Sequence, residues 1–153
     1  MRRLMPRLLP LAAVLAVAGG AGGCSNNNTT TTGTSVTAPA AATTTEEFSG
    51  TLALNGAFSY PFTVVTAGEI VATLTTLTPA GSPIGTAAAS PIGMSLGTWN
   101  GSACQQVLSN DAAIQGTVVV GQTSSSGTFC VRVYDAVGTV AVPESYVVNV
   151  SHP

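Results

Sequence analysis

Apolar side chains occupy every second position in several segments between residues 48 and 153. The clearest segments are Phe58–Val64, Ile70–Leu74, Ile92–Leu96, Phe129–Val133 and Tyr146–Val150. Side chains two positions apart in a β-strand point to the same face, so each segment predicts a strand with one buried face. No segment has a sustained helical spacing of apolar residues. This part of the chain is therefore predicted to be all-β.

Two Asn-Gly pairs lie between these segments. Asn55–Gly56 and Asn100–Gly101 have the dipeptide that tight hairpin turns prefer, because both residue types tolerate a positive φ. Residues 48–153 are long enough to bury one modest core, and an all-β chain of this size commonly forms a sandwich. We expect a single antiparallel β-sandwich over this range.

The first 47 residues have a different pattern. Arg2, Arg3 and Arg7 precede an apolar stretch, Leu8–Ala18, which is followed by small residues. This is the layout of a cleaved export signal, and the stretch is about half as long as the ~20 residues of a membrane-spanning helix. Residues 24–47 are rich in Thr, Asn and Ala and have no aromatic residue or apolar period, so they predict a disordered tether.

The chain has three cysteines, Cys24, Cys104 and Cys130. An exported protein is expected to pair an even subset of its cysteines. Cys104 and Cys130 both lie in the predicted sandwich, so we expect a disulfide between them. Cys24 is left over, at the junction between the signal and the tether.

The stretch AGGC that ends at Cys24 resembles the lipobox of bacterial lipoproteins. The resemblance implies a signal peptide over residues 1–23 and a lipidated Cys24 as the mature N-terminus, with membrane lipid as its partner. It also implies a lipid-anchored location in the bacterial cell envelope, and Ser25 favours transport to the outer membrane or the cell surface. The alternative is an ordinary secretory signal that leaves Cys24 as a free thiol.

Charge excludes one class of partner. Without the signal, Arg132 is the only Lys or Arg side chain left, against six Asp and Glu residues. Nucleic-acid binding draws most of its affinity from several basic side chains that neutralise phosphates. We therefore expect no nucleic-acid partner, and polybasic docking on anionic lipid fails for the same reason.

The predicted strands also resemble the bacterial pre-peptidase C-terminal domain. The matching motifs are Tyr60-x-Phe62-x-Val64, the sequence GTFCVRV over residues 127–133, and Tyr146-x-Val148-x-Val150. This resemblance implies a β-sandwich of jelly-roll type, which in that family is an accessory module of secreted enzymes. The chain lacks the Asp-rich middle strand often found in the family, which argues against an inherited calcium site.

Three side chains are nevertheless candidate calcium ligands. Asn110, Asp111 and Asp135 supply the oxygen atoms that calcium prefers, provided that they converge at one edge of the sandwich. The alternative is that they stabilise turns, as Asx residues in β loops commonly do. One histidine and two paired cysteines leave too few ligands for zinc, and no cofactor is predicted.

Trp99 and Tyr134 are the candidate ligand-binding residues. Gly93, Ser95 and Gly97 leave one face of the strand before Trp99 nearly bare, which beside an exposed aromatic ring is typical of a sugar-binding platform. The alternative is that Trp99 covers the core, because large aromatic side chains are mostly buried.

Catalytic chemistry has little support in the sequence. The only histidine, His152, is expected to be a solvated, mobile tail residue. Glu46–Glu47 are expected at the end of the tether and the other acids in turns, so no catalytic carboxylate pair is predicted. We expect a non-catalytic envelope lipoprotein with a structural or protein-interaction role. The alternative is a surface carbohydrate-binding module, so that the expected partner is an envelope protein or a glycan.

Overall fold

The computed structural model describes residues 42–83 and 88–153. These ranges contain eight β-strands: β1 (Thr44–Leu52), β2 (Ala57–Val64), β3 (Gly68–Pro79), β4 (Ile92–Trp99), β5 (Cys104–Ala113), β6 (Val118–Thr123), β7 (Gly127–Tyr134) and β8 (Glu144–His152). None of the described residues forms a helix that is long and apolar enough to cross a membrane. The predicted signal peptide, Cys24 and the predicted tether up to residue 41 lie outside the described residues.

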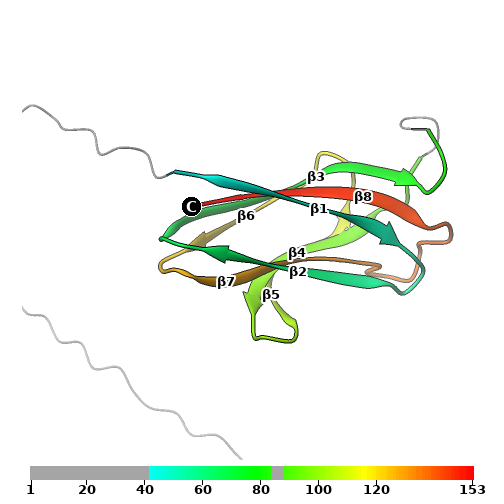
Figure 1. The fold of residues 1–153 in the computed structure, drawn as a ribbon. Helices are drawn as coiled ribbons and strands as arrows, with labels where there is room; N and C mark the ends of the chain where they lie inside the picture. Colours follow the sequence, from blue (N-terminus) through cyan, green and yellow to red (C-terminus); the bar gives the residue numbers. More distant parts are fainter. Residues whose placement is uncertain (1–41, 84–87) are drawn as a thin grey trace, which may run out of the picture. The chain divides into compact units, whose positions relative to one another are not determined.

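The strands form two antiparallel sheets of four strands each, in the orders β1-β8-β3-β6 and β2-β7-β4-β5 (Figure 1). Every connection between consecutive strands passes from one sheet to the other except the hairpin between β4 and β5. The first and last strands pair with each other, and the strand order is that of an eight-stranded jelly roll. The predicted all-β sandwich of jelly-roll type is confirmed.

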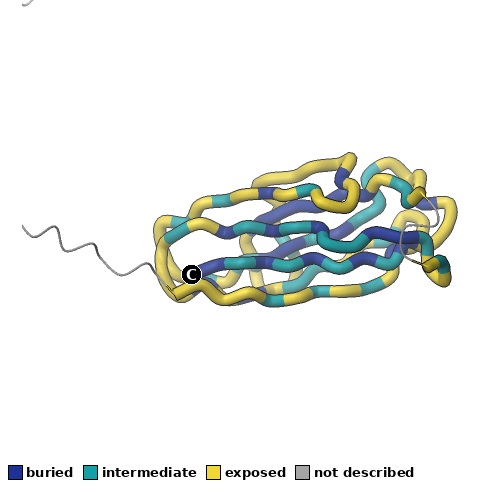
Figure 2. Tube along the Cα trace, turned by 90° about the horizontal axis from the view of Figure 1, so that it is seen from above, coloured by how far each residue is buried: buried dark blue, intermediate teal, exposed yellow. Residues whose placement is uncertain are grey.

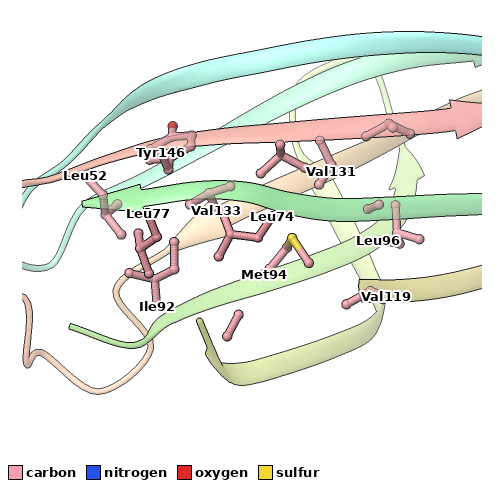
Figure 3. Packing of buried hydrophobic residues seen from close by; sticks show 14 of the residues in the cluster. Leu52, Leu74, Leu77, Ile92, Met94, Leu96, Val119, Val131, Val133 and Tyr146 are labelled. Carbon is pink, nitrogen blue, oxygen red and sulfur yellow. The ribbon is translucent and has the colours of Figure 1, made fainter. Parts of the chain in front are cut away.

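The core lies between the two sheets and consists of the inward half of each alternating strand. Along β8, buried and half-buried residues alternate at every position, as the dark blue and teal segments of Figure 2 illustrate. Leu74, Met94 and Val131, from three different strands, meet in this layer without any exposed surface (Figure 3). Burying one such side chain contributes about 1.5–3 kcal/mol to the stability of the fold. The alternating apolar residues therefore stabilise each strand with its predicted face toward the core.

The two Asn-Gly pairs both form turns, but only one of them closes a hairpin. Asn100–Gly101 joins β4 to β5 within one sheet, as predicted, and its glycine has a φ of 97°. At Asn55–Gly56 the glycine N–H donates to the Ala53 carbonyl at 2.8 Å, and the asparagine has a φ of 56°. This turn leads from β1 in one sheet to β2 in the other. Local chemistry determines the bend, whereas packing determines which sheet the next strand joins.

Strand β1 begins at Thr44, before the predicted start of the sandwich at residue 48. It pairs with β8 along its whole length. Glu46 and Glu47, expected at the end of the tether, are therefore strand residues. Backbone pairing with β8 and the β-branched threonines at the start of β1 favour a strand here without any apolar alternation in the segment.

Candidate functional site

The candidate site lies on the outer face of the β2-β7-β4-β5 sheet. In β7, Val131 and Val133 are fully buried, so Arg132 and Tyr134 project from the opposite, outer face. The register places Arg132 opposite Ser59 of β2 and opposite Ser95 of β4. Side chains directly opposite each other on neighbouring strands share a face, so the sheet gathers these polar groups around the arginine.

Tyr134 covers the part of this face where the sequence predicts a bare strand. Its ring lies where a Cβ on Gly93 would be, so only glycine fits beneath it. The Tyr134 hydroxyl donates a hydrogen bond to the Asp111 carboxylate on β5. Burial, and then the hydrogen bond and negative charge of Asp111, raise the pKa of Tyr134 above its ordinary value. The phenol therefore remains a neutral hydrogen-bond donor.

The rest of the predicted bare strand is covered as well. Gly93, Ser95 and Gly97 are all buried. The Gln106 side-chain amide donates to Ser95 Oγ at 3.0 Å, and the Gln105 carbonyl occupies the space that a Cβ on Gly97 would need. The prediction of a smooth, open strand face is therefore wrong. The side chains and backbone that fill it come from β5 and β7, which the sequence of β4 cannot reveal.

We refer to Ser59, Ser95, Gln106, Asp111, Arg132 and Tyr134 as the Arg132–Tyr134 face. The Arg132 guanidinium carbon lies 5.1 Å from the centroid of the Tyr134 ring, within the range of a cation–π contact. Among the described residues, no carboxylate forms an ion pair with Arg132 and no acceptor hydrogen-bonds its guanidinium. Arg132 is half-buried as a residue, and its charge has no counterion in the described part of the chain.

Trp99 does not share a platform with Tyr134. Tyr134 is opposite Gly93, whereas Trp99 lies six residues further along β4. At a rise of ~3.3 Å per residue this is a separation of roughly 20 Å. Trp99 is half-buried next to the β4–β5 turn and opposite Cys104. Of the two predicted ligand-binding residues, only Tyr134 belongs to the Arg132–Tyr134 face.

The predicted Cys104–Cys130 disulfide is present, with an Sγ–Sγ distance of 2.07 Å and a Cα–Cα distance of 5.7 Å. It joins β5 to β7 across β4, which lies between them in the sheet. Two strands with a third between them are ordinarily about 9.5 Å apart, so the start of β5 must fold over β4. Gly97 permits this approach because it has no side chain where the Gln105 carbonyl lies.

The three candidate calcium ligands have separate contacts. Asn110 Oδ1 accepts the Ala112 N–H at 3.0 Å, and Asp111 accepts the Tyr134 hydroxyl. Asp135 accepts the N–H groups of the turn residues Asn55 and Thr139, and the first of these bonds is the main reason why its pKa is lowered. Residues 42–83 and 88–153 contain no group of three or more His, Cys, Asp or Glu side chains that could hold a metal ion. For Asp135 these contacts are the turn-stabilising alternative, whereas Asn110 bonds a backbone N–H within strand β5.

His152 is a buried strand residue, not the solvated tail residue that the sequence predicts. It is 3% exposed, and its ring stacks on Phe62 with 5.1 Å between the ring centroids. Its Nε2 lies 3.1 Å from Glu46 Oε1, and its Nδ1 lies 3.2 Å from the backbone oxygen of Pro153. The physical reason is that β8 continues its alternation to this residue and pairs there with β1. The same alternation was the sequence signal for its burial.

Glu144 is a second buried polar residue that sequence reasoning missed. It occupies the other end of the same inward row of β8 and is 1% exposed. Its Oε1 accepts the Ser90 N–H at 2.8 Å, and its Oε2 has no hydrogen-bond partner among the described residues. The carboxylate therefore ties the start of β8 to the segment before β4.

An apolar groove of about 170 Å³ lies between the edge strands β5 and β6. Its lining includes Ile70, Leu96, Leu108, Gly121 and Phe129 and shares no residue with the Arg132–Tyr134 face. Five strands contribute to the groove, which is why no single segment of the sequence predicts it. Its lining offers few of the hydrogen-bonding groups that a sugar requires.

No family model and no curated protein matches the chain. The resemblances to bacterial lipoproteins and to the pre-peptidase C-terminal domain therefore remain expectations that rest on the motifs themselves. What the described residues add is a jelly roll whose outer face carries one unpaired arginine beside a tyrosine.

Proposed function

We propose that this chain is a lipid-anchored, non-catalytic protein of the bacterial cell envelope that presents a jelly-roll sandwich for a structural or protein-interaction role. The observation that carries the proposal is the pairing of two of the three cysteines. Cys104 and Cys130 bond to each other, which leaves Cys24 as the one cysteine of the chain outside this disulfide. That cysteine ends the lipobox-like stretch, and a thiol at that position accepts lipid in the family that it resembles.

The distance along the chain also fits an anchored domain. Residues 25–43 separate Cys24 from the first residue of β1. A flexible segment of this length spans on average roughly 25 Å, from about 5–6 Å times the square root of its length. As the proposed tether, it holds the sandwich just clear of the head-group layer.

The places of the polar core residues support a non-catalytic role. The imidazole of His152 is stacked on Phe62 and bonded to Glu46, so it does not face a substrate. A general base must reach the proton that it removes, within about 3 Å or through one water. Glu144 is likewise enclosed in the core.

Substitution of Cys24 tests the anchor. Wild-type chain and C24S are expressed in a bacterial host with a clickable palmitate analogue, and the membrane and soluble fractions are compared. We expect wild type in the membrane fraction with the label, and C24S without the label in the soluble envelope fraction. The matched control, C104S/C130S, removes the other two cysteines and keeps the label. A C24S chain that stays in the membrane fraction would overturn the proposal.

We propose glycan binding at the Arg132–Tyr134 face as a second candidate function. The supporting observation is that one aromatic ring, the Gln106 amide and the Ser59 hydroxyl share the outer face of one sheet with Arg132. Aromatic rings pack on the apolar face of a sugar, while amides and hydroxyls bond its hydroxyl groups.

The test of this second function compares two aromatic positions. Calorimetric titration with a glycan panel compares wild type, Y134L and W99L. Glycan affinity is expected to fall in Y134L, which lacks the ring that is proposed to pack on the sugar, and to stay unchanged in W99L. The reverse result would place the binding site at the β4–β5 hairpin instead.

A further inference from the structure

The guanidinium of Arg132 is the only Lys or Arg charge of the described residues, and no described carboxylate pairs with it. It has five N–H donors in a planar fork. Its only contact of polar character is with the Tyr134 ring, and it neither pairs with a carboxylate nor hydrogen-bonds to the described residues. These N–H donors are available to an anionic ligand, and hydrogen bonds between ionised partners are stronger than those between neutral ones.

The residues around Arg132 favour an orientation of the guanidinium in which it can bind an anion. The Tyr134 ring lies against it at 5.1 Å and restricts its orientation, and Ser59 and Ser95 lie opposite it on the two neighbouring strands. The nearby carboxylate, that of Asp111, instead accepts the Tyr134 hydroxyl. A planar guanidinium that is fixed on one side by an aromatic ring binds a carboxylate with two parallel N–H···O bonds.

We infer that the Arg132–Tyr134 face binds a sugar unit that carries a single carboxylate, with Arg132 as the group that recognises the carboxylate. The inference rests on the glycan-binding function proposed above and specifies its ligand. In this arrangement the carboxylate pairs with the guanidinium, the sugar ring lies along the Tyr134 side of the face, and Ser59 and Gln106 are within the same surface to bond its hydroxyl groups.

The charge of the sandwich favours a sparsely charged ligand over a polyanion. The described residues contain six acidic side chains and one arginine. A polymer with a negative charge on every unit would be repelled by the remaining acids, and one arginine neutralises only one of its charges. The hydroxyl and amide groups around Arg132 also suit the many hydroxyls of a sugar better than an acidic peptide, which is normally held by a cluster of arginines.

The experiment uses sugars that differ only by the carboxylate. The full chain, purified in detergent, is titrated with glucose against glucuronic acid and with galactose against galacturonic acid, and binding is measured by NMR and calorimetry. We expect the carboxylated member of each pair to bind at least tenfold more tightly. Raising the ionic strength should weaken binding of the carboxylated sugar and leave that of the neutral sugar unchanged.

Two variants at one position identify the recognising group. R132Q removes the charge and is expected to bind both members of each pair with the affinity of the neutral sugar. R132K keeps the charge without the planar fork and is expected to retain a reduced preference for the carboxylated sugar. If R132Q fails to fold, R132K still shows whether Arg132 recognises the carboxylate. W99F is the control, and its preference should equal that of wild type.

The outcomes separate this inference from the function on which it rests. Equal affinity for the two members of each pair, unchanged in R132Q, would overturn the inference while glycan binding stands. Absence of binding by every sugar would overturn both. Arg132-dependent binding of a capped peptide with one glutamate, without binding of any sugar, would also overturn the inference and identify a protein partner.

Discussion

Removal of the Cys104–Cys130 disulfide tests how the β4–β5 hairpin is held on the sandwich. The perturbation is the double substitution C104A/C130A. The bond closes a loop with a sequence separation of 26 residues. In the chain-entropy model, a loop of this length destabilises the unfolded state by about 3.5 kcal/mol at 25 °C. Cys130 is fully buried, so the loss of its sulfur adds a smaller packing term of about 1 kcal/mol.

Urea denaturation in non-reducing buffer measures this effect. We expect the free energy of unfolding of C104A/C130A to be about 3.5–4.5 kcal/mol below that of wild type. We also expect a larger dependence of that free energy on urea, because the unfolded chain without the cross-link is more expanded and exposes more surface. The increase in urea dependence distinguishes an effect on the unfolded state from simple loss of native contacts.

The control for the disulfide experiment is C24A, which removes a cysteine outside the bond and should leave both quantities unchanged. A loss below about 1 kcal/mol with an unchanged urea dependence would refute the loop-closure reasoning. It would mean that pairing within the sheet already holds the start of β5 over Gly97, and that the disulfide adds little.

Three further predictions concern single residues. G93A should destabilise the sandwich by about 1–3 kcal/mol in urea denaturation, because the new methyl group meets the Tyr134 ring. The matched variant G121A, whose Cβ would make ordinary contacts in the apolar groove, should be neutral or stabilise by about 0.4–1 kcal/mol. Equal effects of the two substitutions would contradict the packing described. H152A should lower the free energy of unfolding by about 2–4 kcal/mol, since it removes a buried ring, and no change would mean that the side chain is solvated after all. The turn N–H bonds lower the pKa of Asp135, so its carboxylate stabilises the folded state above the unfolded pKa of about 3.9. This stabilisation is lost as the pH falls through the lower folded pKa, so the free energy of unfolding should change less between pH 6 and pH 2 in D135N than in wild type. Identical curves for the two proteins would contradict this assignment.

The candidate site shows which contacts local pattern cannot give. Tyr134 is predicted from its residue type, but its partners come from elsewhere: Gly93 lies on β4 and Asp111 on β5. Arg132 stands out in the sequence as the only Lys or Arg side chain after the signal, yet its lack of an ion pair is visible only when the neighbouring strands are in place. The separation of Trp99 from Tyr134 likewise follows from the register of β4 with β7.

The sequence by itself determined the secondary structure class, the inward face of most strands and the cysteine pair, because these depend on period-two alternation and on a simple count. It even contained the burial of His152, since the alternation of β8 runs to that residue. Only the tertiary structure decided which sheet each strand joins, what covers Gly93 and Gly97, and which polar groups surround Arg132. The physical reason is that alternation is a property of one strand, whereas a surface of a jelly roll is assembled from strands that are neighbours in space but far apart along the chain.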